Sequence, residues 1–184
     1  NPDSSDKSFS VDNDNFFYGD DDYFSMRSSW TDDSATILNG HAGQGEGGHS
    51  HLDTGTFILD MLGERWAHDL GKDDYNIKGL DKKETRYLYY RYSPQGHNCL
   101  VINPGMDDTF YDMDSFCPVY RKEFKEKGGY VIYDMTPAQS GRATDAKRGF
   151  RLDDNRRSAV VRDEVTLAKQ NSDVYWFMQT KADI

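Results

Sequence analysis

Two histidines and an aspartate stand at alternate positions within residues 48–57, and this spacing constrains the fold more than any other feature. Alternate residues of an extended strand point to the same side, so His49, His51 and Asp53 would share one face. If the strand continues, that face also carries Phe57 and further apolar residues, which makes it the core side. Imidazoles and a carboxylate facing a core are costly unless something satisfies them. The sequence therefore predicts a metal ion at this strand.

Two further candidate ligands follow the histidine segment, at Asp69 and His97. Two imidazoles and a carboxylate are good ligands for zinc, and three protein ligands would leave a fourth position open, as in catalytic sites. A His-x-His pair without such context is more often an ordinary surface or core feature. Asp53 either holds a histidine tautomer or stabilises a turn at Thr54-Gly55. His41 carries no signal.

The composition favours strands and excludes several classes of function. Tyrosine (12), phenylalanine (10) and tryptophan (3) are plentiful among the 184 residues, and such residues suit a sheet. The formal net charge of -10 argues against a nucleic-acid partner, and an anionic substrate would need local positive charge. No apolar run is long enough to span a membrane. Cys99 and Cys117 are expected to be free thiols, although one disulfide stays open as an alternative.

The chain divides into a polar segment, residues 1–22, and an all-β domain, residues 23–184. One edge strand is expected near residues 16–18, and residues 71–85 are expected to form a charged loop. No stretch indicates an amphipathic helix, and we expect the chain to be part of a longer protein. The expected strands lie at residues 23–30, 35–38, 57–62, 65–67, 99–103, 119–124, 130–134, 159–165 and 174–178, with a tight turn at Gly63-Glu64.

With these residues in view, the chain resembles the heparinase II/III-like polysaccharide lyases from Tyr23 to its last residue. The more specific motifs are the histidine segment, residues 49–57, and Gly96-His97-Asn98. The supporting motifs are residues 26–30, 63–71 with Tyr75 downstream, 162–165 and 174–178.

The resemblance implies that the parent protein is a bacterial enzyme with an N-terminal α/α toroid and a C-terminal domain of stacked antiparallel sheets, a β-sandwich. This chain would be the first part of the sheet domain, truncated at its C-terminus. The implied reaction is β-elimination at a uronic acid of heparin, heparan sulfate or an alginate-like glycan. The missing toroid would be a partner that supplies part of the catalytic set, so the fragment alone is expected to be inactive. We expect a periplasmic or secreted parent, although this chain carries no signal segment.

The resemblance also implies roles for individual residues. By the family pattern His49 faces the substrate cleft, where it would neutralise the uronate carboxylate or assist proton transfer, and Tyr75 reaches the same cleft. His51, Asp69 and His97 match the residues that bind a mostly structural metal, expected here to be zinc.

Other interpretations of these residues stay open. Arg27 and Arg91 are candidates for contact with the acidic sugar, and a salt bridge to a carboxylate explains each equally well. Ordinary sheet aromatics are the alternative interpretation of Tyr75 and of the tyrosines between residues 87 and 92. One competing function is a non-catalytic, metal-stabilised carbohydrate-binding or structural β-sandwich. Another is a cupin-like enzyme with a redox metal, against which the order of the motifs argues.

Overall fold

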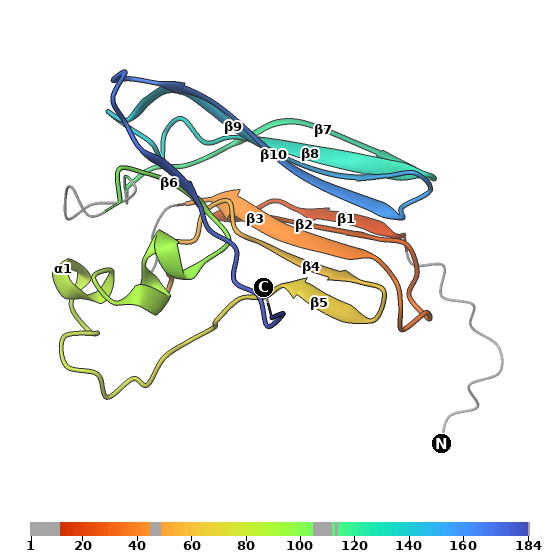
Figure 1. Ribbon diagram of the computed structural model, residues 1–184, viewed down its shortest axis with the longest axis horizontal. Helices are drawn as coiled ribbons and strands as arrows, with labels where there is room; N and C mark the ends of the chain where they lie inside the picture. Colours follow the sequence, from red (N-terminus) through yellow and green to blue (C-terminus); the bar gives the residue numbers. More distant parts are fainter. Residues whose placement is uncertain (1–11, 45–48, 105–111, 113, 184) are drawn as a thin grey trace.

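The structure, a computed structural model, is nearly all β. It describes residues 12–44, 49–104, 112 and 114–183. The strands form three antiparallel sheets, of which two large ones stack face to face (Figure 1). The described part also contains a four-residue helix, α1 (Lys83–Arg86), and two 3-10 turns, at Tyr90–Tyr92 and Pro94–Gly96. None of its helices has the length and apolar character needed to cross a membrane. The expectation of an all-β fold with stacked antiparallel sheets is confirmed.

The first sheet is a meander in which each strand pairs with the next along the chain. Its strands are β1 (Asp14–Phe17), β2 (Asp21–Arg27), β3 (Ile37–Gly43), β4 (Phe57–Met61) and β5 (Glu64–Ala67). β1 is the edge strand expected in the polar segment. The hairpin turn between β4 and β5 is at Leu62-Gly63, one residue earlier than the predicted Gly63-Glu64, because the positive φ angles of 58° and 81° at these two residues suit a two-residue hairpin turn. β3 continues through Asn39 and Gly40, although the sequence predicts that the strand ends there.

The second sheet has the order β10-β9-β8-β7, and a short sheet pairs β11 with β6. Their strands are β6 (Leu100–Ile102), β7 (Val119–Lys125), β8 (Gly128–Asp134), β9 (Ala143–Asp153), β10 (Ser158–Leu167) and β11 (Val174–Trp176). β9 is the longest strand, and the sequence does not predict it. Arg148 and Gly149 interrupt its alternation of polar and apolar residues, because Arg148 takes a core-facing position between Ala146 and Phe150.

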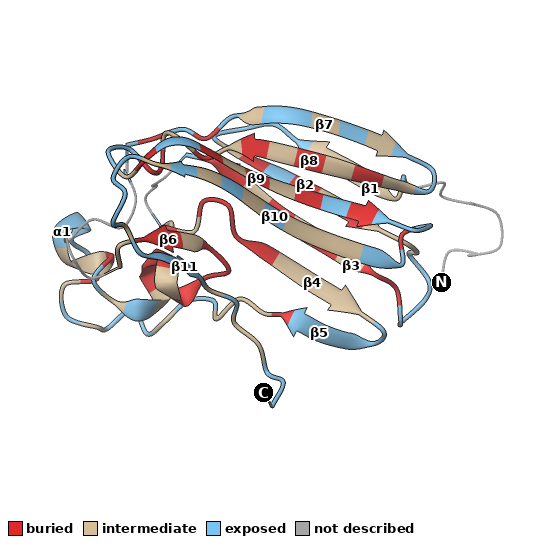
Figure 2. Cartoon of the chain, turned by 45° about the horizontal axis from the view of Figure 1, so that its top comes forward, coloured by how far each residue is buried: buried red, intermediate tan, exposed pale blue. Residues whose placement is uncertain are grey.

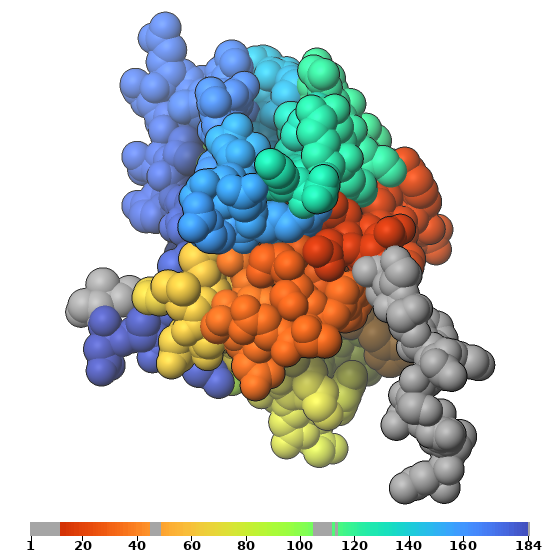
Figure 3. Space-filling view, turned by 90° about the vertical axis from the view of Figure 1, so that its right-hand side faces the viewer, coloured from red at the N-terminus to blue at the C-terminus, as the bar shows by residue number. Residues whose placement is uncertain are grey.

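The main core fills the space between the two large sheets. Figure 2 shows buried and more exposed residues alternating along the strands, and Figure 3 shows the second sheet packed directly on the first. Phe24 of the first sheet meets Phe150 of the second at a ring-centroid distance of 4.8 Å. A smaller core of Leu52, Tyr87 and Tyr92 lies among the loops that follow β5. This second core supports the histidine segment.

The strand expected through the histidine segment does not form. Residues 49–56 run as turns and irregular chain, and the sheet begins only at Phe57. The amide of Thr56 donates to the carbonyl of Asp53 at 2.8 Å, and Gly55 between them has a φ of 87°. A left-handed glycine inside a tight turn is incompatible with a continuous strand. The histidines are therefore brought together by a loop rather than by strand alternation.

Candidate functional site

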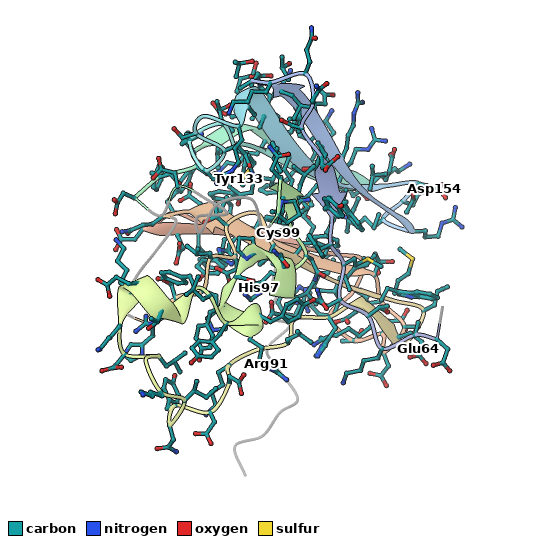
Figure 4. All side chains as sticks on the ribbon, turned by 60° about the vertical axis from the view of Figure 1, so that its left-hand side comes forward. Glu64, Arg91, His97, Cys99, Tyr133 and Asp154 are labelled. Carbon is teal, nitrogen blue, oxygen red and sulfur yellow. The ribbon has the colours of Figure 1, made fainter. Side chains whose placement is uncertain are left out.

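His97 joins two of the other predicted site residues into a hydrogen-bonded series. Its Nδ1 lies 2.7 Å from Asp69 Oδ2, and its Nε2 lies 3.1 Å from His51 Nδ1. His97 is fully buried, whereas His51 and Asp69 are partly accessible. Figure 4 shows His97 below Cys99 and the core residue Tyr133. Segments from three parts of the chain meet here: the turn after β3, the loop after β5, and the segment before β6.

The protonation states in this series follow from burial and from the neighbouring charges. Burial, together with the neighbouring His97, lowers the pKa of His51, which keeps its imidazole neutral at pH 7. Burial alone would raise the pKa of Asp69, but the hydrogen bond and charge of His97 outweigh it and lower that pKa. The ionised carboxylate accepts from His97 Nδ1, and His97 Nε2 and His51 Nδ1 share one hydrogen bond whose direction depends on the tautomers.

A neutral imidazole and an ionised carboxylate are the forms that bind zinc, so the donor chemistry of the three residues fits the ion. Their arrangement differs from a ligand cage, because the contacts run through opposite sides of the His97 ring. One ion can bind only one of those two nitrogens. No three His, Cys, Asp or Glu side chains among the described residues surround a common point. Binding of one ion by all three residues requires one side chain to turn.

A cavity of about 300 Å³ opens beside this series, and it contains both predicted catalytic residues. The ring centroids of His49 and Tyr75 lie 6.4 Å apart in an edge-on arrangement, and both side chains are exposed. The cavity is lined by His49, His51, Lys72, Tyr75, Leu80, Asp81, Arg86 and Tyr92. The structure therefore groups His49 and Tyr75 with His51 on one accessible surface.

Two cationic residues of this cavity are not predicted from the sequence. Lys72 Nζ lies 5.2 Å from the centre of the Tyr75 ring, and Arg86 Nε donates to the carbonyl of Leu80 at 2.8 Å. Both lie in a charged region of the sequence, and the charge of a surface residue does not indicate which other residues it will lie near in the fold. Together they give the cavity two cations beside the carboxylate of Asp81.

The two predicted sugar-contacting arginines lie outside this cavity. Arg27 ends β2, and its guanidinium stacks 3.6 Å from the ring centre of Trp30. Arg91 lies further from the core than His97 (Figure 4). Its guanidinium donates to the carbonyl of Leu70 and lies 3.6 Å from Asp73 Oδ2. Both arginines therefore have structural contacts, and the salt bridge considered for Arg91 is present.

His41 is a further site neighbour, and the sequence pattern gives it no role. His41 Nε2 lies 3.3 Å from Asp53 Oδ2, and its ring stacks on Tyr23 at 4.9 Å. Burial opposes protonation of His41, but the charge and hydrogen bond of Asp53 outweigh it and raise the pKa of His41. The strand alternation of residues 37–43 is the signal that could have placed His41 beside Tyr23, on the outer face of the first sheet.

A buried arginine ties the second sheet to the two histidine segments. Arg148 Nη1 donates to the carbonyls of Gly55 and Asn98, each at 2.8 Å. Its Nε and Nη2 donate to the carboxylate of Asp163 at 2.7 and 2.9 Å, and Trp176 also donates to that carboxylate. Gly55 follows His51 closely, and Asn98 follows His97. Arg148 thus fixes the spacing of the segments that carry both histidines.

A segment late in the chain completes the surroundings of His97. The Gln179 amide donates to Asn98 Oδ1 at 2.6 Å, and the Gln179 carbonyl accepts from the His68 amide at 2.8 Å. Asn98 Nδ2 in turn donates to the carbonyl of Phe57 at 2.6 Å. Gln179 therefore connects the segments on both sides of the site.

The chain resembles known proteins in its fold. No family model and no curated protein matches the chain. Solved structures do match. The likeness is one of fold. The heparan sulfate lyase HepC from Pedobacter heparinus is 20% identical, with a TM-score of 0.58. A mutant of that lyase is 20% identical with a TM-score of 0.60, and the heparinase III BT4657 gene product with methylated lysines is 19% identical with a TM-score of 0.60. Each match covers 78% of this chain but only 20% of the neighbour, so the chain spans about a fifth of these proteins.

Proposed function

We propose that the chain is the sheet domain of a polysaccharide lyase, which as a whole protein cleaves uronic-acid glycans by β-elimination. The observation that carries this proposal is the accessible cavity where His49, Tyr75 and His51 meet. The proposed glycans are heparin, heparan sulfate or an alginate-like polymer, and the proposed location is periplasmic or secreted. The fold neighbours are heparan sulfate lyases and a heparinase, which supports a lyase-related parent.

The proposed reaction places separate demands on the cavity. The C5 proton of a uronate becomes acidic enough to remove only when the adjacent carboxylate is neutralised. His49, Lys72 and Arg86 supply donors and positive charge for that carboxylate. Tyr75 lies close enough to His49 to take part in proton transfer within the same bound sugar. The leaving oxygen needs an acid, which the toroid domain or Tyr75 would supply.

We further propose that His51, Asp69 and His97 bind a structural zinc ion. When bound, zinc would join three separated segments by coordination to their side chains. The lowered pKa values of His51 and Asp69 support this proposal, because ligands must be deprotonated.

The exposure of the proposed catalytic residues indicates that the isolated chain forms only one side of the active site. Tyr75 is 61% exposed, and His49 is also exposed. Elimination requires a base and an acid positioned on both sides of the sugar, in a cleft that orients it. The alternative function, a non-catalytic carbohydrate-binding domain, shares this exposure. Activity of the whole protein distinguishes the two functions.

The test is turnover of heparin, heparan sulfate and alginate, followed by absorbance of the unsaturated uronate product. We expect turnover by the whole protein and none by residues 1–184 alone. In the whole protein, His49→Ala should lower turnover about 10²–10⁴-fold without a change in melting temperature. His68→Ala is the matched control, because His68 is absent from the cavity lining. Full activity of His49→Ala, or robust turnover by the isolated chain, would contradict the proposed roles.

A further inference from the structure

A larger hollow, which shares no lining residue with the cavity at His49, lies on the outer face of the second sheet. Its volume is about 530 Å³, within the range of about 300–1,000 Å³ that is typical of small-molecule sites. All four strands of the sheet contribute to its lining. The residues that line it are Tyr120, Arg121, Tyr130, Ile132, Lys147, Gly149, Phe150, Arg151, Val160, Arg162 and Glu164. This sheet forms an outer layer, and no other strand or helix of the described chain covers it (Figure 1).

The hollow exists because a glycine occupies an outward position in the middle of the sheet. Gly149 of β9 pairs with Ile132 of β8 on one side and with Arg162 of β10 on the other. A Cβ atom at Gly149 would lie 3.5 Å from Ile132 Cγ1, which is ordinary van der Waals contact. The backbone therefore tolerates a larger residue at this position. The missing side chain at Gly149 leaves the bottom of the hollow, its floor, open, and the larger side chains of the lining residues surround it.

The charge around the hollow is opposite in sign to that of the chain. Four cationic side chains and one carboxylate line it, in a chain of net charge -10. Lys147, Arg151 and Arg162 each pair with a carboxylate two residues away on the same strand. The carboxylates of these pairs are about half exposed, and exposed ion pairs are weak because water screens them, so an anionic ligand can compete for the cations. The guanidinium of Arg121 instead faces the ring of Tyr130, at 6.0 Å.

Aromatic surface accompanies these charges. Tyr120 is 61% exposed, and Lys147 Nζ lies 5.2 Å from the centre of its ring. Tyr130 lies next to the floor, between Arg151 and Glu123 of the neighbouring strands. Flat aromatic faces offer apolar contact area with little loss of conformational entropy, and arginines bind carboxylates and sulfates through two parallel hydrogen bonds. This combination fits a sugar ring that carries anionic groups.

We propose that this hollow is a second binding site for an acidic oligosaccharide, separate from the cavity at His49. The class of the occupant rests on the proposed function, since a lyase of acidic glycans meets such chains at high local concentration. The hollow lies on the outer face of the second sheet and the cavity lies among the loops around α1, so one long glycan could engage the hollow while another segment or chain occupies the cleft. Two linked contacts of moderate strength hold a polymer more tightly than either contact alone.

The test is binding of a size-defined heparan sulfate octasaccharide to residues 1–184, measured by calorimetry and by amide chemical shifts. The wild type should bind, with shifts at Gly149 and Ile132, and a neutral glucan octasaccharide should not bind. Gly149→Leu fills the hollow, and Arg121→Gln removes a cation. Each should weaken binding about tenfold or more, the equivalent of one charge-assisted hydrogen bond. Arg157→Gln is the matched control, because Arg157 is an exposed arginine outside the hollow.

The outcomes separate this site from the lyase proposal. His49→Ala should leave octasaccharide binding at the hollow unchanged, whatever its effect on turnover in the whole protein. Absence of binding by the wild type, equal binding of the neutral glucan, or full binding by Gly149→Leu and Arg121→Gln would overturn the second site. Binding by the isolated chain but not by the whole protein would show that protein covers this face, and would also overturn it. Circular dichroism of both variants tests that the sheet is intact.

Discussion

Replacement of Arg148 by methionine should destabilise the chain far more than the same change at an exposed arginine. Arg148 is 2% exposed and pairs with Asp163, which is 12% exposed. Methionine keeps the apolar stem but leaves a buried carboxylate without its partner and two carbonyls, at Gly55 and Asn98, without a donor. Removal of one member of a buried ion pair typically costs about 3–5 kcal/mol. We expect this loss in the free energy of unfolding.

Arg65→Met is the matched control. Arg65 also makes two hydrogen bonds to one aspartate, Asp60, at 2.6 and 2.8 Å, but its side chain is 49% exposed. An exposed pair contributes about 0–1 kcal/mol, so this variant should unfold almost as the wild type does. The two ion pairs have similar geometry, and they differ in that Arg148 is buried and also donates to two carbonyls.

Urea denaturation followed by far-ultraviolet circular dichroism measures both variants. For a domain of this size, about 3–5 kcal/mol corresponds to a melting temperature lower by about 6–20 °C. The double variant Arg148→Met/Asp163→Asn should recover part of the loss, because no unpaired carboxylate then remains buried. Equal destabilisation by Arg148→Met and Arg65→Met, or no recovery in the double variant, would refute the reasoning from burial.

The other predictions concern the histidines and the thiols. Zinc should raise the melting temperature of the wild type and not that of His51→Ala, and an unchanged wild-type melting curve would count against the metal site. The pKa of His41 by NMR should exceed the usual value and fall in Asp53→Asn; its stabilising contribution is then full below pH 6.5 and lost as the pH rises through the folded pKa. Burial raises the pKa of Cys117 to about 12, so a thiol reagent at pH 8 should react with it only after unfolding; fast reaction of the native chain would contradict this.

The sequence predicts the strands well where apolar and polar residues alternate. β7, β8 and β10 lie where that pattern places them, and both cysteines are free, as expected. β9 escapes prediction because its core-facing series includes Arg148, whose charge is neutralised by Asp163 on a strand that only the fold brings near. A buried ion pair between strands leaves no local trace in either segment.

The contact among the site residues is predicted, but the strand geometry on which that prediction rests is not present in the structure. His51, Asp69 and His97 do lie in contact, as the order of the motifs implies, but a loop rather than a strand carries His51. The sequence indicates a turn at Gly55. The direction of each side chain around that turn also depends on the hydrogen bonds from Arg148 to the carbonyls of Gly55 and Asn98. His41 becomes a neighbour only through strand pairing with Tyr23.

The contact between Gln179 and Asn98 also has a consequence for the order in which the chain folds. The two residues lie 81 positions apart in the sequence, and β11 must pair with β6 before Gln179 can reach its partners. Contacts between distant residues form slowly, because closing a long loop reduces chain entropy before the contact itself stabilises anything. During synthesis the segment that carries His97 would therefore lack its contacts with Gln179 until residues 174–179 leave the ribosome. The first sheet, a meander of neighbouring strands, would form earlier, and the site would be completed after it.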